Sequence, residues 1–141
     1  MARSFWLVKS EPSEYAYTQL AADGVTLWTG VRNFTARNHL AAMRKGDLVL
    51  YYHTGREKAV VAVAKVVGEA RPDPTEQAAE GWVAVELAPV KPLAAPVSLA
   101  AIKADAKLGD LALVRQSRLS VMPIPKPAFE RILALGRTKL G

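Results

Sequence analysis

The sequence has no cysteine and only two histidines among its 141 residues. The lack of cysteine excludes disulfide bonds, cysteine-ligated zinc and a thiol nucleophile. With two histidines, a metal site made of protein side chains alone is not expected, and we predict no cofactor. A Walker loop, a glycine-rich dinucleotide turn and a Ser–His–Asp order are missing as well. These absences favour a binding protein over an enzyme.

Long hydrophobic runs are also missing. The longest apolar runs, such as Leu48–Tyr52, end within a few residues at a charged side chain, so we expect no membrane-spanning segment. The N-terminal residues contain a short apolar run and no small-residue cleavage site, which argues against a signal peptide and favours a cytoplasmic protein. The length and an apolar fraction of 50% predict one domain over residues 1–141, and we expect a monomer.

The net charge of +6 is unevenly distributed along the chain. Residues 32–58 and 115–141 are strongly basic, whereas residues 59–114 carry more acidic than basic side chains. A polarised distribution of this kind favours a polyanionic partner over charge that only keeps a protein in solution. We therefore expect a nucleic acid as partner, and no membrane.

Alternating strand-like and helix-like patterns predict the fold class. Runs rich in β-branched and aromatic residues predict strands at Phe5–Lys9, Leu48–His53, Ala59–Val67, Trp82–Leu87 and Leu119–Met122. Capping residues and helical periodicity predict helices at Ser13–Asp23 with Ser13 as N-cap, Val31–Met43, Ser98–Lys103 and Lys126–Leu135, with one more helical turn within 108–114. Val90–Pro96 reads as a stiff connector. We expect an α+β fold, a small mixed β-barrel of about five or six strands, closed or half-closed, with short helices inserted.

The stretch Trp28–Asn38 carries polar and aromatic chemistry where a core element would carry aliphatic side chains. It contains an indole, a phenyl ring, two guanidinium groups and two carboxamides. Gly30 permits an unusual φ or a close backbone approach at its start. Planar donors beside an aromatic surface suit a flat, polar, anionic ligand such as a nucleotide. The alternative is a capped surface helix in which Trp28 belongs to the core.

Two further pairs of residues stand at predicted strand ends. Ser10 and Glu11 could hydrogen-bond the ring edge of a ligand, or could cap the following helix. Tyr52 and His53 alternate faces at the end of their strand, and we expect one of these faces to be open. A tyrosine or histidine there could stack on a base or donate to it, or could be a structural residue.

A polar segment without periodicity, Arg115–Arg118, lies in the second basic region. Arginine pairs with phosphates in a bidentate manner, while Gln116 and Ser117 could read a base edge. The alternative is an arginine-rich loop that caps backbone carbonyls.

Five linked motifs carry a resemblance that covers nearly the whole chain. They are Lys9–Pro12, Trp28–Asn38, Gly46–His53, Pro72–Pro74 and Arg115–Val121. Together they resemble the EVE domain of the thymocyte nuclear protein family. The resemblance implies a PUA-like β-barrel related to the YTH and ASCH domains. It also implies a module that binds nucleic acid, either DNA or RNA, through a pocket for a modified base such as a modified cytosine.

The resemblance also assigns residues to this pocket. Matching the motifs position by position places in it Ser10, Glu11, Trp28, Val31, Arg32, Asn33, Tyr52, His53, Ser117 and Arg118, with Arg37 and Arg115 as phosphate contacts. Phe34 stands where the family often has tyrosine, and Thr54 where it often has serine. Two other functions stay open: a sensor of free nucleosides that uses the same pocket, and a hydrolase that uses Glu11 or His53.

Overall fold

One mixed sheet of six strands organises the described part of this computed structural model, residues 3–75 and 81–140. The strands are β1 (Phe5–Ser10), β2 (Thr26–Trp28), β3 (Leu48–His53), β4 (Ala59–Pro72), β5 (Val83–Ser98) and β6 (Val121–Pro123). Their order in the sheet is β2-β5-β4-β3-β1-β6. Only β1 and β3 pair in parallel, and the other neighbours are antiparallel. The expected α+β class and strand number are confirmed.

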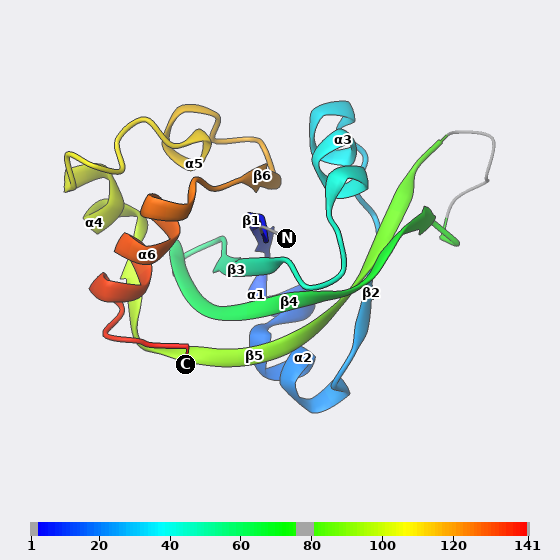
Figure 1. The fold of residues 1–141 in the computed structure, drawn as a ribbon, viewed down its shortest axis with the longest axis horizontal. Helices are drawn as coiled ribbons and strands as arrows, with labels where there is room; N and C mark the ends of the chain where they lie inside the picture. Colours follow the sequence, from blue (N-terminus) through cyan, green and yellow to red (C-terminus); the bar gives the residue numbers. More distant parts are fainter. Residues whose placement is uncertain (1–2, 76–80, 141) are drawn as a thin grey trace.

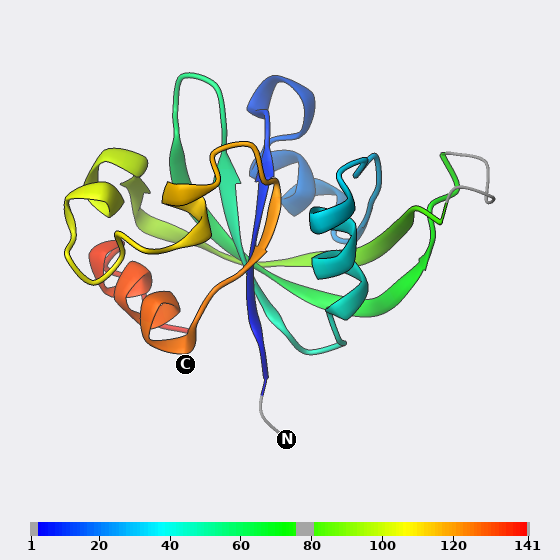
Figure 2. The same cartoon turned by 90° about the horizontal axis from the view of Figure 1, so that it is seen from above.

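In the part of the chain that the structure describes, six short helices connect these strands. They are α1 (Pro12–Tyr15), α2 (Tyr17–Asp23), α3 (Phe34–Ala42), α4 (Leu99–Ala104), α5 (Ala112–Arg115) and α6 (Lys126–Leu135). Helix α3 lies on one side of β1, and α4, α5 and α6 lie on the other (Figure 2). In the described residues no helix has the length and apolar character needed to cross a membrane.

The long β4–β5 hairpin gives the sheet its curl. Its strands have 14 and 16 residues, and their pairing shifts register at four points. Such irregularities bend a strand and increase its twist. Figure 1 shows the two strands sweeping from the end near α4 and α6, below β3, to the side beyond α3. The result is a half-closed barrel.

The parallel pairing of β1 with β3 places the candidate site. All six residues of β3 are buried, as is typical of a strand covered on both faces. The register sets Ser10 opposite His53, so the C-terminal ends of both strands meet at one edge. The chain leaves β1 here through Glu11 into α1, which brings two predicted site motifs together.

The predicted connector at 90–96 is wrong, because this segment is part of β5. Its prolines argued against a strand. However, β2 pairs with β5 only from Val85 to Leu87, so beyond Leu87 one edge of β5 has no neighbouring strand among the described residues. Proline is tolerated on such an edge, because the missing N–H would have faced away from the ladder.

Two helix starts also differ from prediction. Helix α3 begins at Phe34 rather than at Val31, because Asn33 has extended backbone angles and caps it. Helix α1 is capped by Glu11 rather than by Ser13, whose N–H donates to the Glu11 carboxylate. Strand β2 has only three residues and was not predicted, because its pairing with β5 defines it rather than any pattern of its own.

Candidate functional site

A cavity of about 670 Å³ opens at the C-terminal end of β1. The strand end and α1 form one side, and the chain from β2 to the start of α3 forms the other. Six of the predicted ligand-binding residues line it together: Ser10, Glu11, Trp28, Val31, Arg32 and Asn33. Its volume lies within the range of roughly 300–1,000 Å³ that is typical of small-molecule sites. We call this cavity the β1-end pocket.

Trp28 forms the aromatic wall of the β1-end pocket. Its half-buried ring makes T-shaped contacts with Tyr15 and Tyr51, with ring centroids 6.3 and 5.5 Å apart. Burial raises the pKa of Tyr51 to about 12, so its hydroxyl stays protonated and donates to the Tyr15 carbonyl oxygen at 2.8 Å. Ser10 donates to the same carbonyl at 2.7 Å. The Tyr15 hydroxyl donates to Asp23 at 2.7 Å, so both rings that contact the indole are anchored by hydrogen bonds.

A buried carboxylate fixes the rim of the pocket. Asp73, near the end of the β4 side of the hairpin, accepts hydrogen bonds from the Gly30 N–H at 2.9 Å and from the Arg32 guanidinium at 3.1 Å. Its other oxygen accepts from the Thr75 N–H at 2.7 Å and from the Thr75 hydroxyl. Burial would raise the pKa of Asp73, but these four donors outweigh it and lower the pKa to about 2. Gly30 has φ of +81°, the unusual conformation that its position suggested.

Asn33 can serve both the helix and a ligand, because the two ends of its side-chain amide differ. The carbonyl oxygen Oδ1 accepts from the Ala36 N–H at 2.9 Å and so caps α3. The NH₂ end has no hydrogen-bond partner among the described residues, and Asn33 lines the pocket. This side chain can therefore offer donors to a ligand, while its acceptor is occupied by the helix.

Glu11 likewise combines the two functions that its sequence position left open. Its carboxylate accepts from the Ser13 N–H and hydroxyl, both at 3.3 Å, and so caps α1. Glu11 also lines the pocket, and its carboxylate lies against Gly55 in the turn between β3 and β4, where a Cβ would stand 2.7 Å from Oε2. A side chain at position 55 would displace it.

Tyr52 and His53 do not line this pocket. The expected open face of β3 does not exist, because the curled sheet and its helices cover both faces, and the two side chains belong to the buried residues. In His53, Nε2 accepts from the Tyr17 N–H at 3.0 Å, and Nδ1 lies 2.7 Å from the Glu57 carboxylate. Both ring nitrogens are thus engaged. In this conformation neither residue can stack on a ligand.

Ser117 and Arg118 line a second, smaller hollow of about 340 Å³, together with the predicted phosphate contact Arg115. Asn33 lines both hollows, so they are adjacent. Arg115 is exposed and pairs with Asp110 at 2.7 Å. Arg118 is exposed and has no ion-pair partner among the described residues. The two motifs that are far apart in sequence therefore meet at Asn33.

Lys9, which sequence reasoning left out of the site, joins the two hollows. It lines the β1-end pocket, and its ammonium group donates to the Ser117 carbonyl at 2.9 Å. Burial lowers the pKa of Lys9. Lys9 and Ser10 belong to the same motif, Lys9–Pro12, and both carry polar side chains. The sequence therefore contained the signal that could have identified Lys9. Tyr15 and Ser120 also line the pocket, and no pattern in the sequence marks them.

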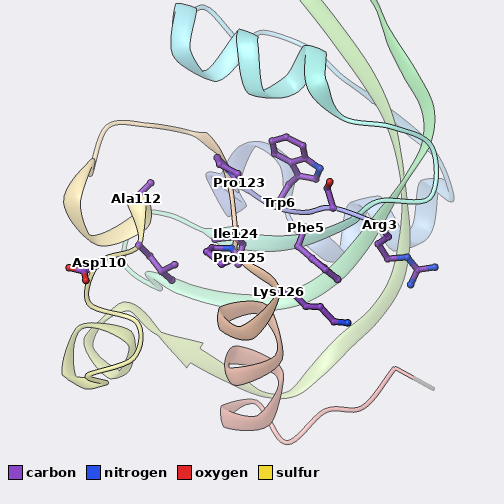
Figure 3. Close-up of a pocket in the computed structure, with 11 residues that line it drawn as sticks. Arg3, Phe5, Trp6, Asp110, Ala112, Pro123, Ile124, Pro125 and Lys126 are labelled. Carbon is purple, nitrogen blue, oxygen red and sulfur yellow. The ribbon is translucent and has the colours of Figure 1, made fainter. Parts of the chain in front are cut away.

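A third cavity, again of about 670 Å³, lies at the opposite end of β1. Figure 3 shows it between Phe5, Ile124 and Lys126, with Arg3 at its edge. Its walls are mainly apolar, and none of the predicted site residues contributes to it. Within the described ranges, no three carboxylate or imidazole side chains cluster in a way that could hold a metal ion.

Comparison with known proteins identifies the family of the chain. The sequence model of the EVE domain matches residues 4–135. The chain is 30% identical to thymocyte nuclear protein 1 of Gallus gallus, over 95% of the chain and 69% of that protein. It is 28% identical to the Homo sapiens protein of the same name, over 94% of the chain and 73% of that protein.

Solved structures share the fold. Rpa0253 from Rhodopseudomonas palustris is 44% identical, with a TM-score of 0.90 over 95% of this chain and 93% of that one. Human THYN1, crystallised in complex with 5-methylcytosine-containing DNA, is 28% identical, with a TM-score of 0.88 over 96% of this chain and 99% of that one. An ASCH protein from Zymomonas mobilis, at 13% identity and a TM-score of 0.61, shares the fold alone. The chain belongs to the EVE domain family and has the PUA-like fold that its motifs predicted.

Proposed function

We propose that this chain binds nucleic acid and takes a modified cytosine into the β1-end pocket, without catalysing a reaction on it. The observation that carries the proposal is the position of Trp28, held edge-on by two tyrosines in a cavity large enough for a base. The human relative that shares this fold was crystallised with 5-methylcytosine-containing DNA. Both facts support the same class of ligand.

The polar groups of the pocket complement the edge of a cytosine. Its amino group is a donor and would face the Glu11 carboxylate, while its ring nitrogen and carbonyl oxygen are acceptors and would face the NH₂ group of Asn33. The buried Val31 offers apolar surface to a substituent on the ring. Trp28 would stack on the base, which contributes on the order of 1–3 kcal/mol.

Cationic side chains give the strand a path past the pocket. Lys9 lines the β1-end pocket and donates to Ser117 of the second hollow, which Arg115 and Arg118 also line. Arg32 donates a hydrogen bond to Asp73, so we assign it to the stabilisation of the rim rather than to phosphate binding. We propose that Arg118, Arg115 and Arg37 contact the strand's phosphates, which makes the affinity dependent on salt.

The test is a titration with fluorescent oligonucleotides that carry 5-methylcytosine or cytosine at one position, as DNA and as RNA. The wild-type chain should prefer the methylated strand, and Trp28→Ala should lose roughly 5- to 150-fold in affinity, corresponding to one lost stacking contact. Arg118→Ala should lower the slope of log K against log salt by about 1. Lys126→Ala, at the cavity on the opposite end of β1, is the matched control and should leave the slope unchanged.

Salt-independent binding, or equal affinity of wild-type and Trp28→Ala, would contradict the proposal. The alternative of a nucleoside sensor is an arm of the same experiment. Free 5-methylcytidine that binds as tightly as the methylated oligonucleotide would favour the sensor, because phosphate contacts would then contribute nothing.

A further inference from the structure

An exposed aromatic cluster borders the β1-end pocket without lining it. Phe34 is 63% exposed, the most exposed of the large hydrophobic side chains in the described residues. Its ring stacks on Trp82, with centroids 5.1 Å apart and planes inclined by 24°. Phe34 begins α3 and Trp82 stands directly before β5, so the contact joins a helix start to the hairpin tip that Figure 1 shows beyond α3.

Two guanidinium groups lie against this ring pair. Arg37 is centred 5.0 Å from the Phe34 ring and 5.8 Å from the Trp82 ring, and Arg32 is 5.5 Å from the Trp82 ring. The side-chain hydrogen bonds of Arg37 go to the neutral Asn38, and among the described residues no carboxylate pairs with its guanidinium group. Aromatic surface combined with uncancelled positive charge is complementary to stacked bases on an anionic backbone.

The location of the cluster connects it to the proposed site. Phe34 directly follows Arg32 and Asn33, which line the β1-end pocket, and precedes Thr35, which lines the second hollow. A base held in the pocket therefore has its strand neighbours within reach of the Phe34 ring. A protein partner that buried this cluster would remove the charge of Arg37 from water, which costs free energy, so a protein partner is disfavoured.

We propose that Phe34, backed by Trp82 and flanked by Arg37, is a second stacking site that covers the neighbour of the base held in the pocket. This inference rests on the proposed function and deepens it. When one base leaves a stack, the face of its neighbour becomes exposed to water, and the unstacking opposes binding. A phenyl ring placed on that face replaces the lost stacking, while Arg37 faces the adjoining phosphate.

The experiment compares Phe34→Ala, Phe34→Leu and Phe34→Tyr in binding to a DNA duplex with one central 5-methylcytosine, and to the free 5-methyldeoxycytidine nucleoside. The alanine and leucine variants should bind the duplex roughly 5- to 150-fold more weakly, the effect of one base–aromatic stack, while the tyrosine variant should bind normally. None of the three should change binding of the nucleoside, which has no neighbouring base. Val90→Ala is the matched control, since Val90 is another exposed apolar residue at 41%.

A second readout reports the stack directly. With 2-aminopurine beside the 5-methylcytosine, the wild-type complex should fluoresce less than the Phe34→Ala complex, because stacking quenches this base. Equal duplex affinity and equal fluorescence for the wild-type and Phe34→Ala would overturn this inference alone. Failure of the wild-type chain to bind any oligonucleotide would overturn the proposed function, and the inference with it.

Discussion

The carboxylate of Asp73 accepts a hydrogen bond from the backbone N–H of Gly30 at 2.9 Å, across a sequence separation of 43 residues. This bond ties the hairpin to the loop that leads from β2 into α3. The same carboxylate holds Arg32, so one residue with 3% exposure fixes both the backbone and a guanidinium group of the pocket rim. The geometry of the rim thus depends on a residue that does not line the pocket.

Replacing Asp73 by asparagine should destabilise the chain and loosen the rim. Both carboxylate oxygens accept from backbone N–H groups, so an amide NH₂ at either position would face another donor. The lowering of the Asp73 pKa from 3.8 to about 2 corresponds to about 2 kcal/mol of stability near neutral pH. Urea unfolding should show a loss of at least this size, together with weaker binding of methylated DNA.

The stabilisation by the ionised Asp73 carboxylate should depend on pH. Because the pKa is lowered in the folded state, the contribution is complete above pH 4 and is lost as the pH falls towards 2. The stability difference between the wild-type chain and Asp73→Asn should therefore shrink over this interval. Asp110→Asn, which removes an exposed ion pair with Arg115, is the control and should be nearly neutral. A constant difference from pH 7 to pH 2 would contradict the assignment.

Two glycines provide a matched test of Glu11. Gly55 and Gly46 have φ of +77° and +97°, so alanine at either should cost about 1–2 kcal/mol through backbone strain. A Cβ at Gly55 would also stand 2.7 Å from the Glu11 carboxylate, whereas at Gly46 nothing lies within 4 Å. Gly55→Ala should thus weaken binding of the modified base, and Gly46→Ala should lower only the melting temperature. Equal binding by both variants would show that the position of Glu11 does not matter.

The sequence predicts best those features of the site that residues close together in the chain determine. Ser98 was expected to cap a helix, and its hydroxyl accepts from the Ala101 N–H at 3.0 Å. Gly30 was expected to permit either an unusual φ or a close backbone approach, and its φ is +81°. The motif at Trp28–Asn38 places Trp28 and Asn33 in one cavity because only a few residues separate them.

Long-range pairing explains what could not be predicted. Alternation along β3 suggested an open face for Tyr52 or His53, but the burial of this strand depends on β1, on β4 and on the curl of the hairpin. The strand character of 90–96 likewise depends on distant residues: β4 pairs with this segment, and no described strand covers its other edge, where prolines are tolerated. The role of Asp73 in positioning the rim could not be predicted, because its donor Gly30 is distant in sequence.

His53 should prove structural rather than catalytic. Its Nε2 accepts a hydrogen bond from the Tyr17 N–H, so Nδ1 carries the proton and donates to Glu57. His53→Ala would leave the Tyr17 N–H buried without a partner, at a cost of about 1–3 kcal/mol. Unfolding experiments should show this loss, while binding of methylated DNA below the melting temperature should change little. Loss of a hydrolytic activity in His53→Ala, with normal stability, would instead support the hydrolase reading.

Asn33 allows helix capping to be separated from ligand recognition, because its two amide ends do different things. Serine and aspartate both cap helices well, so Asn33→Ser and Asn33→Asp should unfold at nearly the same urea concentration as the wild-type chain. Both lack the NH₂ donor, and aspartate adds a charge that opposes a base acceptor and a phosphate. Methylated DNA should therefore bind more weakly to Asn33→Ser and most weakly to Asn33→Asp. Asn33→Ala loses the cap as well and should be destabilised by about 0.5–2 kcal/mol. Wild-type affinity in Asn33→Ser would show that Asn33 serves the helix alone.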